Sequence, residues 1–257
     1  MTNTKSNQRC AVITGCTGSL GGHLARRLME DGWRVVGVAR RTDPELEKLE
    51  PFRGVAIDLG TLEAKNSLFD LLKTENPALF VHAAVHYGNP RVLDRNLPEI
   101  ETMFRVNAHS AFLAFAEYCE AGPMEQFCTF VPINSDAIFH TTATNAAYAA
   151  SKAALRVLAA GLAERCKTSN GCVATLALGP LADHSKTSQL KALAEKRGIS
   201  MEALTAEYMR RSNPFLVIEE LIDLEACYRC IETIVDLGAM ANGMVCRLDG
   251  GSAGALI

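Results

Sequence analysis

The stretch Cys10–Gly22, CAVITGCTGSLGG, determines the fold. An apolar run of strand length, CAVIT, leads into a glycine-rich turn and then into a helical pattern with Leu20, Leu24 and Leu28 on one face. Glycine in such a turn permits positive φ and lets the backbone approach a phosphate group without a Cβ in the way. The following helix N-terminus offers unpaired N–H groups and a partial positive charge. The strand–turn–helix order therefore predicts dinucleotide binding, rather than only a tight turn.

The same alternation continues along the chain. Apolar runs predict strands at Cys10–Thr14, Arg34–Val38, Gly54–Ile57, Leu79–His82, Gln126–Ile133, Cys172–Leu178 and Met244–Leu248. Helical patterns between them cover Leu20–Asp31, Met103–Cys119 and Ala147–Cys166. Nearly continuous apolar strands indicate a sheet that is covered on both faces. We therefore expect an α/β protein, a Rossmann-type doubly wound parallel sheet of about seven strands with helices on both faces.

One region departs from this pattern. Residues 182–214 are polar and helical in pattern, and they follow the sixth predicted strand. Ligands of such sheets bind beyond the carboxyl ends of the strands, where an insertion can form a lid. We expect a single domain over residues 1–257 with a helical substrate lid at about 182–214, which we favour over a plain surface hairpin.

Composition limits the possible functions. The 257 residues are 48% hydrophobic with a net charge of -3, which favours one globular domain and argues against nucleic acid as the partner. The nine cysteines lie mostly in apolar runs, and the Cys227–Cys230 pair has no second pair nearby, so we expect reduced thiols and no metal. Neither a signal peptide nor a membrane span is evident, and we expect a cytoplasmic protein without membrane partners.

The end of the second predicted strand bears on the choice of cofactor. A site for NAD usually places an acidic residue there for the ribose 2′-hydroxyl. This strand is followed by Arg40 and Arg41, and the first acid is Asp43. Guanidinium groups match phosphate oxygens, so the sequence favours NADP(H) over NAD(H), against the alternative of two solvated surface charges.

A tyrosine and a lysine are spaced for proton chemistry. Tyr148 and Lys152 are four residues apart in a helical pattern, which places both on one face. A neighbouring ammonium would lower the tyrosine pKa from about 10 and make the phenol a usable acid or base. Ser135 follows the apolar strand QFCTFVPI, where its hydroxyl could bond a substrate carbonyl.

Together these motifs resemble the short-chain dehydrogenase/reductase family in its single-domain, ketoreductase-like form, over nearly the whole chain. The matching residues are Thr14–Gly21, Asp58–Leu59, Ala83–Ala84, Asn107, Ser135, Tyr148, Lys152 and Leu248–Gly251. The resemblance implies an NADP(H)-dependent oxidoreductase that reduces a ketone of a small-molecule substrate, or of an acyl-type intermediate, to a secondary alcohol.

The resemblance also implies roles for individual residues. Tyr148 would be the acid/base, Ser135 would polarise the substrate, and Lys152 would lower the tyrosine pKa and bind the ribose. Asn107 would hold a water that links Lys152 to a proton relay, although an asparagine early in a helix can also bond only local backbone. The implied cofactor residues are Gly15, Thr17, Gly18, Ser19, Leu20, Gly21, Arg40, Arg41, Asp58, Leu59, Ala83, Ala84, Tyr148, Lys152, Gly179 and Pro180.

The chain departs from the family pattern at three places. Ser19 stands where the middle glycine falls, a spacing closer to the family's extended branch. His82 replaces an asparagine, and we expect it to be buried and hydrogen-bonded. Gly179-Pro180 reverses the usual Pro-Gly and no threonine follows before Thr187, so backbone groups or Ser185 would hold the nicotinamide.

Two other functions remain open. One is a sugar-nucleotide epimerase or dehydratase of the extended type, which would need a larger C-terminal substrate domain. The other is a binding protein that keeps the fold without the chemistry.

Short-form members of this family mostly form dimers or tetramers, and the chain is consistent with a homodimer or homotetramer. The helix Ala147–Cys166 is rich in alanine, and the tail Ala253–Ile257 is apolar. The alternative is that these helices only cover their own sheet.

Overall fold

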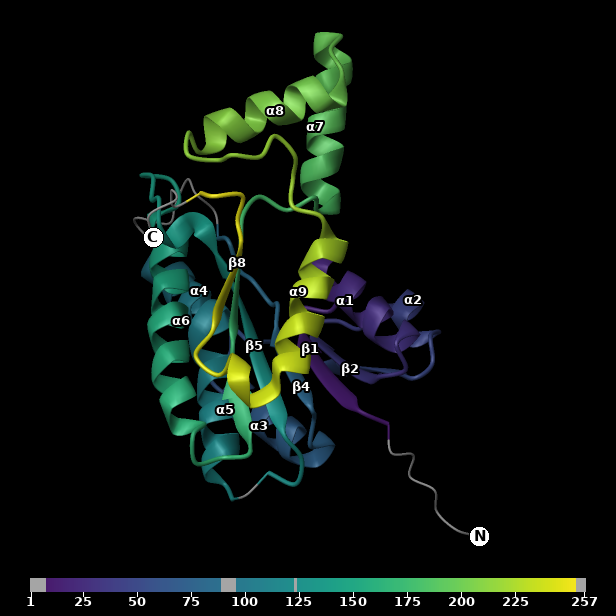
Figure 1. Ribbon diagram of the computed structural model, residues 1–257, viewed down its shortest axis with the longest axis vertical. Coiled ribbons are helices and arrows are strands. Elements are labelled where there is room, and N and C mark those ends of the chain that lie inside the picture. Colours follow the sequence, from purple (N-terminus) through teal and green to yellow (C-terminus); the bar gives the residue numbers. More distant parts are fainter. Residues whose placement is uncertain (1–7, 89–95, 123, 253–257) are drawn as a thin grey trace.

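The computed structural model describes residues 8–88, 96–122 and 124–252, and one parallel sheet runs through the centre of the chain (Figure 1). Its spatial order is β3-β2-β1-β4-β5-β7-β8, with β6 beside β5. The strands are β1 (Cys10–Thr14), β2 (Arg34–Ala39), β3 (Phe52–Ala56), β4 (Leu79–His82), β5 (Cys128–Ser135), β6 (Gly171–Val173), β7 (Thr175–Leu178) and β8 (Val245–Leu248). The predicted doubly wound parallel sheet is confirmed.

The sheet has one strand more than the pattern suggested, because the run Cys172–Leu178 is two strands. β6 pairs with the first half of β5, at Cys128–Phe130, and β7 pairs with its second half, at Ile133–Ser135. Only β7 continues to β8. Apolar periodicity cannot show this division, because both halves are buried on both faces.

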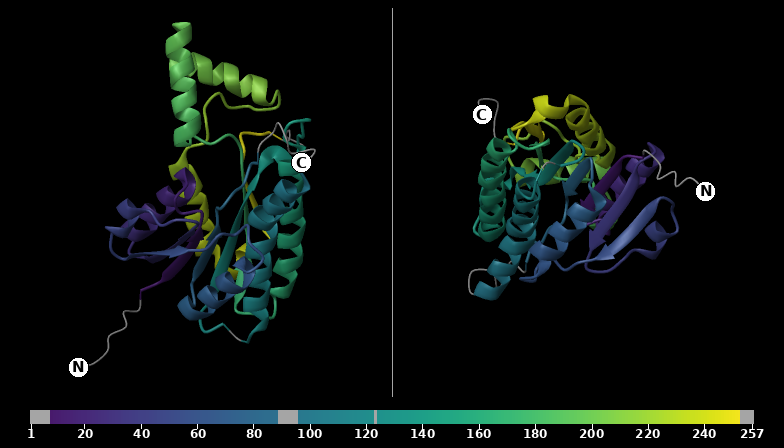
Figure 2. Two further views of the ribbon diagram at one scale, coloured as in Figure 1. Left: turned by 180° about the vertical axis from the view of Figure 1, so that it is seen from behind. Right: turned by 90° about the horizontal axis from the view of Figure 1, so that it is seen from below.

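Helices cover both faces of the sheet, as Figure 2 shows. Helices α1 and α9 lie on one face, and α3, α5 and α6 lie on the other. The helices are α1 (Ser19–Glu30), α2 (Pro44–Glu47), α3 (Ala64–Glu75), α4 (Leu97–Phe104), α5 (Ser110–Glu120), α6 (Ala146–Arg165), α7 (His184–Arg197), α8 (Met201–Ser212) and α9 (Leu224–Leu237).

Alternation along the central strand divides the core between the two faces. In β1, Ala11 and Ile13 join the cluster under α1 and α9, whereas Cys10 and Val12 join the cluster under α3, α5 and α6. All four side chains are almost completely buried. This arrangement fixes the end of β1, and with it the position of the glycine turn.

The predicted helix Met103–Cys119 was wrong as a single unit. The chain forms α4 up to Phe104, a π-helical turn at Arg105–His109, and then α5 from Ser110. Asn107 lies inside this turn, fully buried. Short π-helical turns are frequent at functional sites, because they change the direction of a few backbone groups without ending the helix.

The carboxyl ends of β1 and β4 mark the point where the strand order reverses. From β1 the chain passes to β2 and β3 on one side, and then returns to β4 and β5 on the other. Ligands of doubly wound sheets bind at this point. Helices α7 and α8 project beyond the same end of the sheet (Figure 1).

Two further findings concern the expectations about membranes and the tail. Among the described residues, none of the helices is both long and apolar enough to span a bilayer. The apolar tail Ala253–Ile257 lies outside the described residues.

Candidate active site

A cavity of about 780 Å³ lies at the carboxyl end of the sheet, between the glycine turn and α6. Its wall includes eleven of the residues predicted from the sequence: Gly15, Gly18, Ser19, Leu20, Gly21, Ala83, Ser135, Tyr148, Lys152, Gly179 and Pro180. The other predicted site residues, which are Thr17, Arg40, Arg41, Asp58, Leu59, Ala84 and Asn107, are not part of its wall. The structure thus brings the glycine turn and the Ser–Tyr–Lys set into one space.

The glycine turn depends on residues without a Cβ. Gly15 has a φ of 74°, and a Cβ there would lie 2.7 Å from the backbone of Ala84. A Cβ on Gly21 would lie 2.3 Å from the carbonyl oxygen of Gly15. Larger residues at these positions would push the first turn of α1 away from the ends of β1 and β4.

The N-terminus of α1 is open toward the cavity. Its N-cap residue, Gly18, has no side chain to bond the first N–H groups, and Gly18 and Ser19 both line the cavity. Free N–H groups and the positive end of a helix dipole suit a phosphate. The residues present therefore fit a dinucleotide, with its pyrophosphate at the start of α1.

His82 joins the two strands that form the switch point. It is completely buried at the end of β4, and its Nδ1 shares a hydrogen bond of 2.8 Å with Oγ1 of Thr14 at the end of β1. Burial, and then the ammonium of Lys152, lower the pKa of His82 to about 3, against the nearby backbone of Asn107 and Val106. The expectation of a buried, hydrogen-bonded histidine is confirmed.

Ser135 is the last residue of β5 and faces Tyr148 on α6. Its Oγ accepts a hydrogen bond from the N–H of Ala137 at 3.2 Å and donates one to Oδ1 of Asp136 at 3.3 Å. The ring of Tyr148 lies against the ring of Tyr87 in a tilted arrangement, with 4.9 Å between centroids and 33° between the ring planes. These contacts hold two hydroxyls, those of Ser135 and Tyr148, in the same part of the cavity.

The electrostatics of Tyr148 differ from the expectation. Burial and then Tyr87 raise the pKa of Tyr148 well above its usual range, whereas a hydrogen bond with Ser135 lowers it. Lys152 is not among the causes of this shift, and the lowering of the tyrosine pKa by lysine stays a prediction. The phenol is protonated at neutral pH, as in an ordinary tyrosine, and burial makes its phenolate still less favourable.

Lys152 is directed into the protein. It is only 3% exposed, and its Nζ donates a hydrogen bond of 2.9 Å to the carbonyl oxygen of Ile133. Burial lowers the pKa of Lys152 to about 8, so the ammonium form predominates at neutral pH. It is a cation in the cavity wall, with protons directed at the backbone of β5.

Asn107 lies behind the cavity. Its Nδ2 donates to the carbonyl oxygen of His86 and to Oγ of Ser151, each at 2.9 Å, and its Oδ1 accepts from the N–H of His86 at 2.7 Å. Ser151 in turn donates to the carbonyl oxygen of Tyr148 at 2.7 Å. The side chain of Asn107 thus positions α6. Its binding of a water stays a prediction, and because these side-chain groups are engaged, the backbone of Asn107 would have to hold that water.

Arg40 and Arg41 follow directly on β2 and are exposed. Within the described ranges neither guanidinium has an ion-pair partner. The nearest acid, Asp43, caps α2 by accepting hydrogen bonds from the N–H groups of Glu45 and Leu46. Its carboxylate is therefore already occupied by the backbone.

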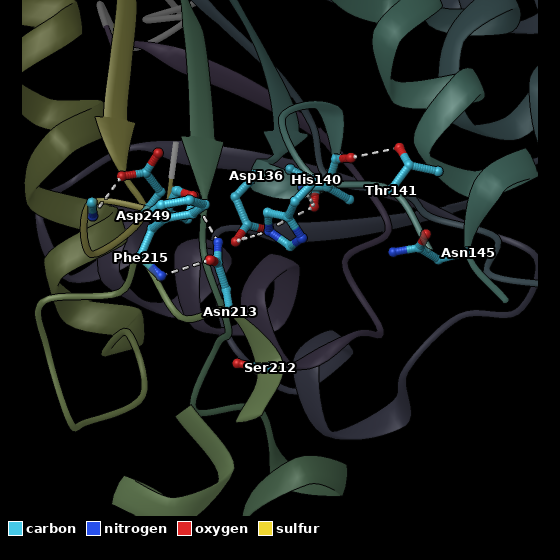
Figure 3. A network of polar contacts seen from close by, with 12 residues as sticks. Asp136, His140, Thr141, Asn145, Ser212, Asn213, Phe215 and Asp249 are labelled. Carbon is cyan, nitrogen blue, oxygen red and sulfur yellow. Dashed lines mark hydrogen bonds and ion pairs between the residues drawn. The ribbon is translucent and has the colours of Figure 1, made fainter. Parts of the chain in front are cut away.

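Sequence reasoning missed three polar residues around Ser135. Asn134 donates to the carbonyl oxygen of Lys152 at 3.1 Å and accepts from the N–H of Ser135 at 2.8 Å, which ties β5 to α6. Asp136 and His140 line the cavity and are hydrogen-bonded to each other, with 3.1 Å between Oδ2 and Nε2 (Figure 3). The available signal was the run Asn134-Ser135-Asp136 at the end of an apolar strand.

Comparisons with known proteins agree with this geometry. The family model "short chain dehydrogenase" matches residues 9–194. The uncharacterized oxidoreductase YvrD of Bacillus subtilis (strain 168) is 23% identical, over 95% of this chain and 96% of that protein.

Solved structures share the fold. L-Sorbose reductase from Gluconobacter frateurii, complexed with NADPH and L-sorbose, superposes with a TM-score of 0.80 at 17% identity, over 99% of this chain and 100% of that one. A 4-hydroxyisoleucine dehydrogenase complexed with NADH gives a TM-score of 0.77 at 20% identity, over 95% and 98%.

The family model covers well over half of the chain, and it includes the glycine turn and the Ser–Tyr–Lys set. The chain therefore belongs to the short-chain dehydrogenase/reductase family and is an oxidoreductase of that family.

Proposed function

We propose that this enzyme uses NADPH to reduce a ketone of a small molecule to a secondary alcohol, with Tyr148 as the proton donor. The observation that carries the proposal is the shared cavity, in which the glycine turn, Ser135, Tyr148 and Lys152 line one continuous wall. A nicotinamide cofactor on the glycine turn supplies the hydride when it is bound. Ser135 and Tyr148 then bond the carbonyl oxygen, and the phenol proton passes to that oxygen.

The charge state of Tyr148 supports the reductive direction. Reduction of a ketone needs a proton donor, and the raised pKa of Tyr148 keeps its phenol protonated at neutral pH. Oxidation of an alcohol would need the phenolate, which burial disfavours. The direct test is to mix the protein with NADPH and a panel of ketones and to follow the loss of NADPH absorbance.

Arg40 supports the choice of NADP(H), because it is exposed at the end of β2 while Asp43 is occupied by its helix cap. A charge-assisted hydrogen bond to phosphate contributes about 1.5–3 kcal/mol, or a factor of about ten or more in affinity. We expect Arg40→Ala to raise the Kd for NADPH by at least about tenfold and to leave the Kd for NADH nearly unchanged. Fluorescence titration of both cofactors measures this.

Arg41→Ala tests the neighbouring guanidinium of the same exposed stretch, which the resemblance also assigns to the cofactor; a larger loss of NADPH affinity in Arg40→Ala than in Arg41→Ala would make Arg40 the main contact of the 2′-phosphate. If Arg40→Ala weakens NADPH and NADH equally, Arg40 does not contact the 2′-phosphate.

Helices α7 and α8 support the proposed lid in an otherwise single domain. They pack on each other through a small separate cluster of Leu190, Ala194 and Leu204. Tyr208 of α8 lines the cavity, and the N–H at the start of α7 donates to Oγ of Ser19 at 3.2 Å. Because the lid has its own small core, it can move as a unit. Its hydrogen bond to Ser19 places it next to the glycine turn, over the proposed cofactor site.

We also infer a homo-oligomer that pairs α5 and α6 with their copies. Leu113 on α5 is 47% exposed and Val157 on α6 is 72% exposed, which leaves apolar surface on the outer side of both helices. Most oligomers of one chain are symmetric, so a dimer or tetramer is expected. Light scattering after size exclusion checks this, and a mass of 27.8 kDa at micromolar concentration would mean a monomer.

A cytoplasmic location is part of the same proposal. All nine cysteines are free. The thiol pKa is raised at seven of them, and burial is the main cause at most of these seven. Buried thiols of this kind suit a reducing compartment.

A further inference from the structure

We propose that the preferred substrate carries a hydroxyl group on the carbon next to the reacting carbonyl, and that Asp136 binds this hydroxyl. The inference rests on the ketone reduction proposed above and names its substrate class. It begins from a buried carboxylate that neither the fold nor the proton transfer requires.

Asp136 lies directly beside the reacting centre. It is 7% exposed, lines the cavity, and follows Ser135 in the chain. Its Oδ2 pairs with Nε2 of His140 at 3.1 Å, and its Oδ1 accepts the hydroxyl proton of Ser135 at 3.3 Å (Figure 3). The carboxylate is thus held in place on one side by His140 and on the other by the serine that would polarise the substrate.

Ser135 has a single proton to donate. In the structure that proton goes to Asp136, whereas polarising a ketone requires it at the carbonyl oxygen. A ketone that takes this proton leaves Oδ1 of Asp136 without its donor. An acceptor that is left unsatisfied in a buried site costs free energy, and the cost is larger for a charged group.

A hydroxyl on the neighbouring carbon of the substrate removes this cost. The substrate hydroxyl donates a hydrogen bond to Oδ1 of Asp136 while the hydroxyl of Ser135 donates to the carbonyl oxygen. Oδ1 of Asp136 therefore keeps a donor. Oγ of Ser135 and Oδ1 of Asp136 lie 3.3 Å apart, so one small substrate can contact both. A carboxylate at the same place would instead meet a like charge.

Two other polar side chains of the cavity wall, Asn213 and Asn145, already have hydrogen-bond partners in the protein. Asn213 donates to the carbonyl oxygen of Ser252 at 2.7 Å and accepts from the N–H of Phe215 at 2.9 Å (Figure 3). Oδ1 of Asn145 accepts from the N–H of Thr142 at 2.7 Å. Asp136, next to Ser135 in the chain, is therefore the acceptor that we expect the substrate hydroxyl to bind.

The reaction balances as an ordinary reduction. The carbonyl carbon gains hydride from NADPH, the carbonyl oxygen gains the proton of Tyr148, and the C=O π bond is lost. The product is a vicinal diol, NADPH is oxidised to NADP⁺, and the phenolate left on Tyr148 takes up a proton from solvent.

Three ketones of similar size test the inference: hydroxyacetone, butanone, which has a methyl in place of the hydroxyl, and pyruvate, which has a carboxylate. With NADPH at saturation, we expect kcat/KM for hydroxyacetone to exceed that for butanone and for pyruvate by at least about tenfold. In Asp136→Asn we expect the ratio to butanone to fall by about tenfold and pyruvate to gain about tenfold relative to butanone.

Asp136→Ser also removes the charge and should reduce both ratios in the same way, so it serves if the Asn variant does not fold. Asp183→Asn is the matched control, because Asp183 is another carboxylate of the cavity wall. It caps α7, a role that asparagine can also fill, and should change both ratios by less than about twofold.

The outcomes separate this inference from the function on which it rests. Failure to reduce any of these ketones or of the wider panel, with NADPH still bound, overturns the reductase assignment. Equal kcat/KM for butanone and hydroxyacetone in the wild type overturns only the substrate class. Ratios that stay unchanged in both Asp136 variants show that another group makes the selection.

Discussion

Tyr148→Phe is expected to lower kcat for ketone reduction by about 10²–10⁴-fold while NADPH still binds, since this is the usual contribution of a positioned acid or base. The substitution removes only the hydroxyl. The ring keeps its contact with the ring of Tyr87, at 4.9 Å between centroids, so the cavity wall keeps its shape. Steady-state rates and a cofactor titration on the same preparation separate loss of chemistry from loss of binding.

Tyr87→Phe is the matched comparison, because its ring is the neighbour of Tyr148 and also lines the cavity. A hydrogen bond with Ser135 lowers the pKa of Tyr148, whereas Ser135 is not among the causes of the pKa shift of Tyr87. A near-normal kcat in Tyr148→Phe together with a large loss in Tyr87→Phe would show that Tyr87, and not Tyr148, donates the proton.

Lys152→Met is expected to make the protein without ligands more stable and at the same time nearly inactive. Burial lowers the pKa of Lys152 from 10.5 to about 8. A shift of this size means that the buried ammonium costs about 3 kcal/mol of folding stability. Loss of the hydrogen bond to Ile133 offsets about 1 kcal/mol, so we expect a net gain of about 2 kcal/mol, or roughly 4–8 °C in Tm at neutral pH.

The pH dependence gives this prediction its sign. Below pH 8 the lysine is charged in both the folded and the unfolded protein, and the full cost of burying the charge is present. Between pH 8 and 10.5 the folded protein releases its proton first, so the wild type becomes more stable relative to Lys152→Met. Thermal denaturation across this range checks it. An advantage for methionine that is constant or grows with pH would show that the lysine is not held as a strained cation.

The activity of the same variant tests the catalytic placement of Lys152. By its resemblance to the family, the lysine holds the cofactor ribose and assists Tyr148, and we expect kcat/KM to fall by at least about a hundredfold. Such a variant would be more stable and less active, a common trade-off where a site holds a charge against its burial cost.

Much of the fold was predictable because its signals are local. The glycine turn follows an apolar strand and precedes a helical pattern, and the structure has this order at Cys10–Glu30. Strand-length runs gave most strands to within two residues. Two predicted elements were wrong as single units, because contacts with other elements set their boundaries. The run Cys172–Leu178 is divided by its pairing with β5, and the helix before Cys119 is interrupted by the π-helical turn at Asn107.

The sequence also identified which residues would gather, though not all of their partners. Spacing alone placed Tyr148 and Lys152 on one face of α6, and both line the cavity with Ser135. It did not show that Asn107 bonds His86 and Ser151, or that Asp136 accepts the proton of Ser135. These contacts join segments or side chains whose relation depends on how the elements pack.

The order of the elements, the glycine turn and the spacing of Tyr148 and Lys152 follow from local patterns in the chain, because helix and strand periodicities and glycine conformations act over a few residues. The charge states of the site depend instead on how distant segments pack around it. The pKa of Tyr148 is raised and that of Lys152 is lowered because both are removed from water by segments distant in the chain, and the loss of hydration penalises each charged form.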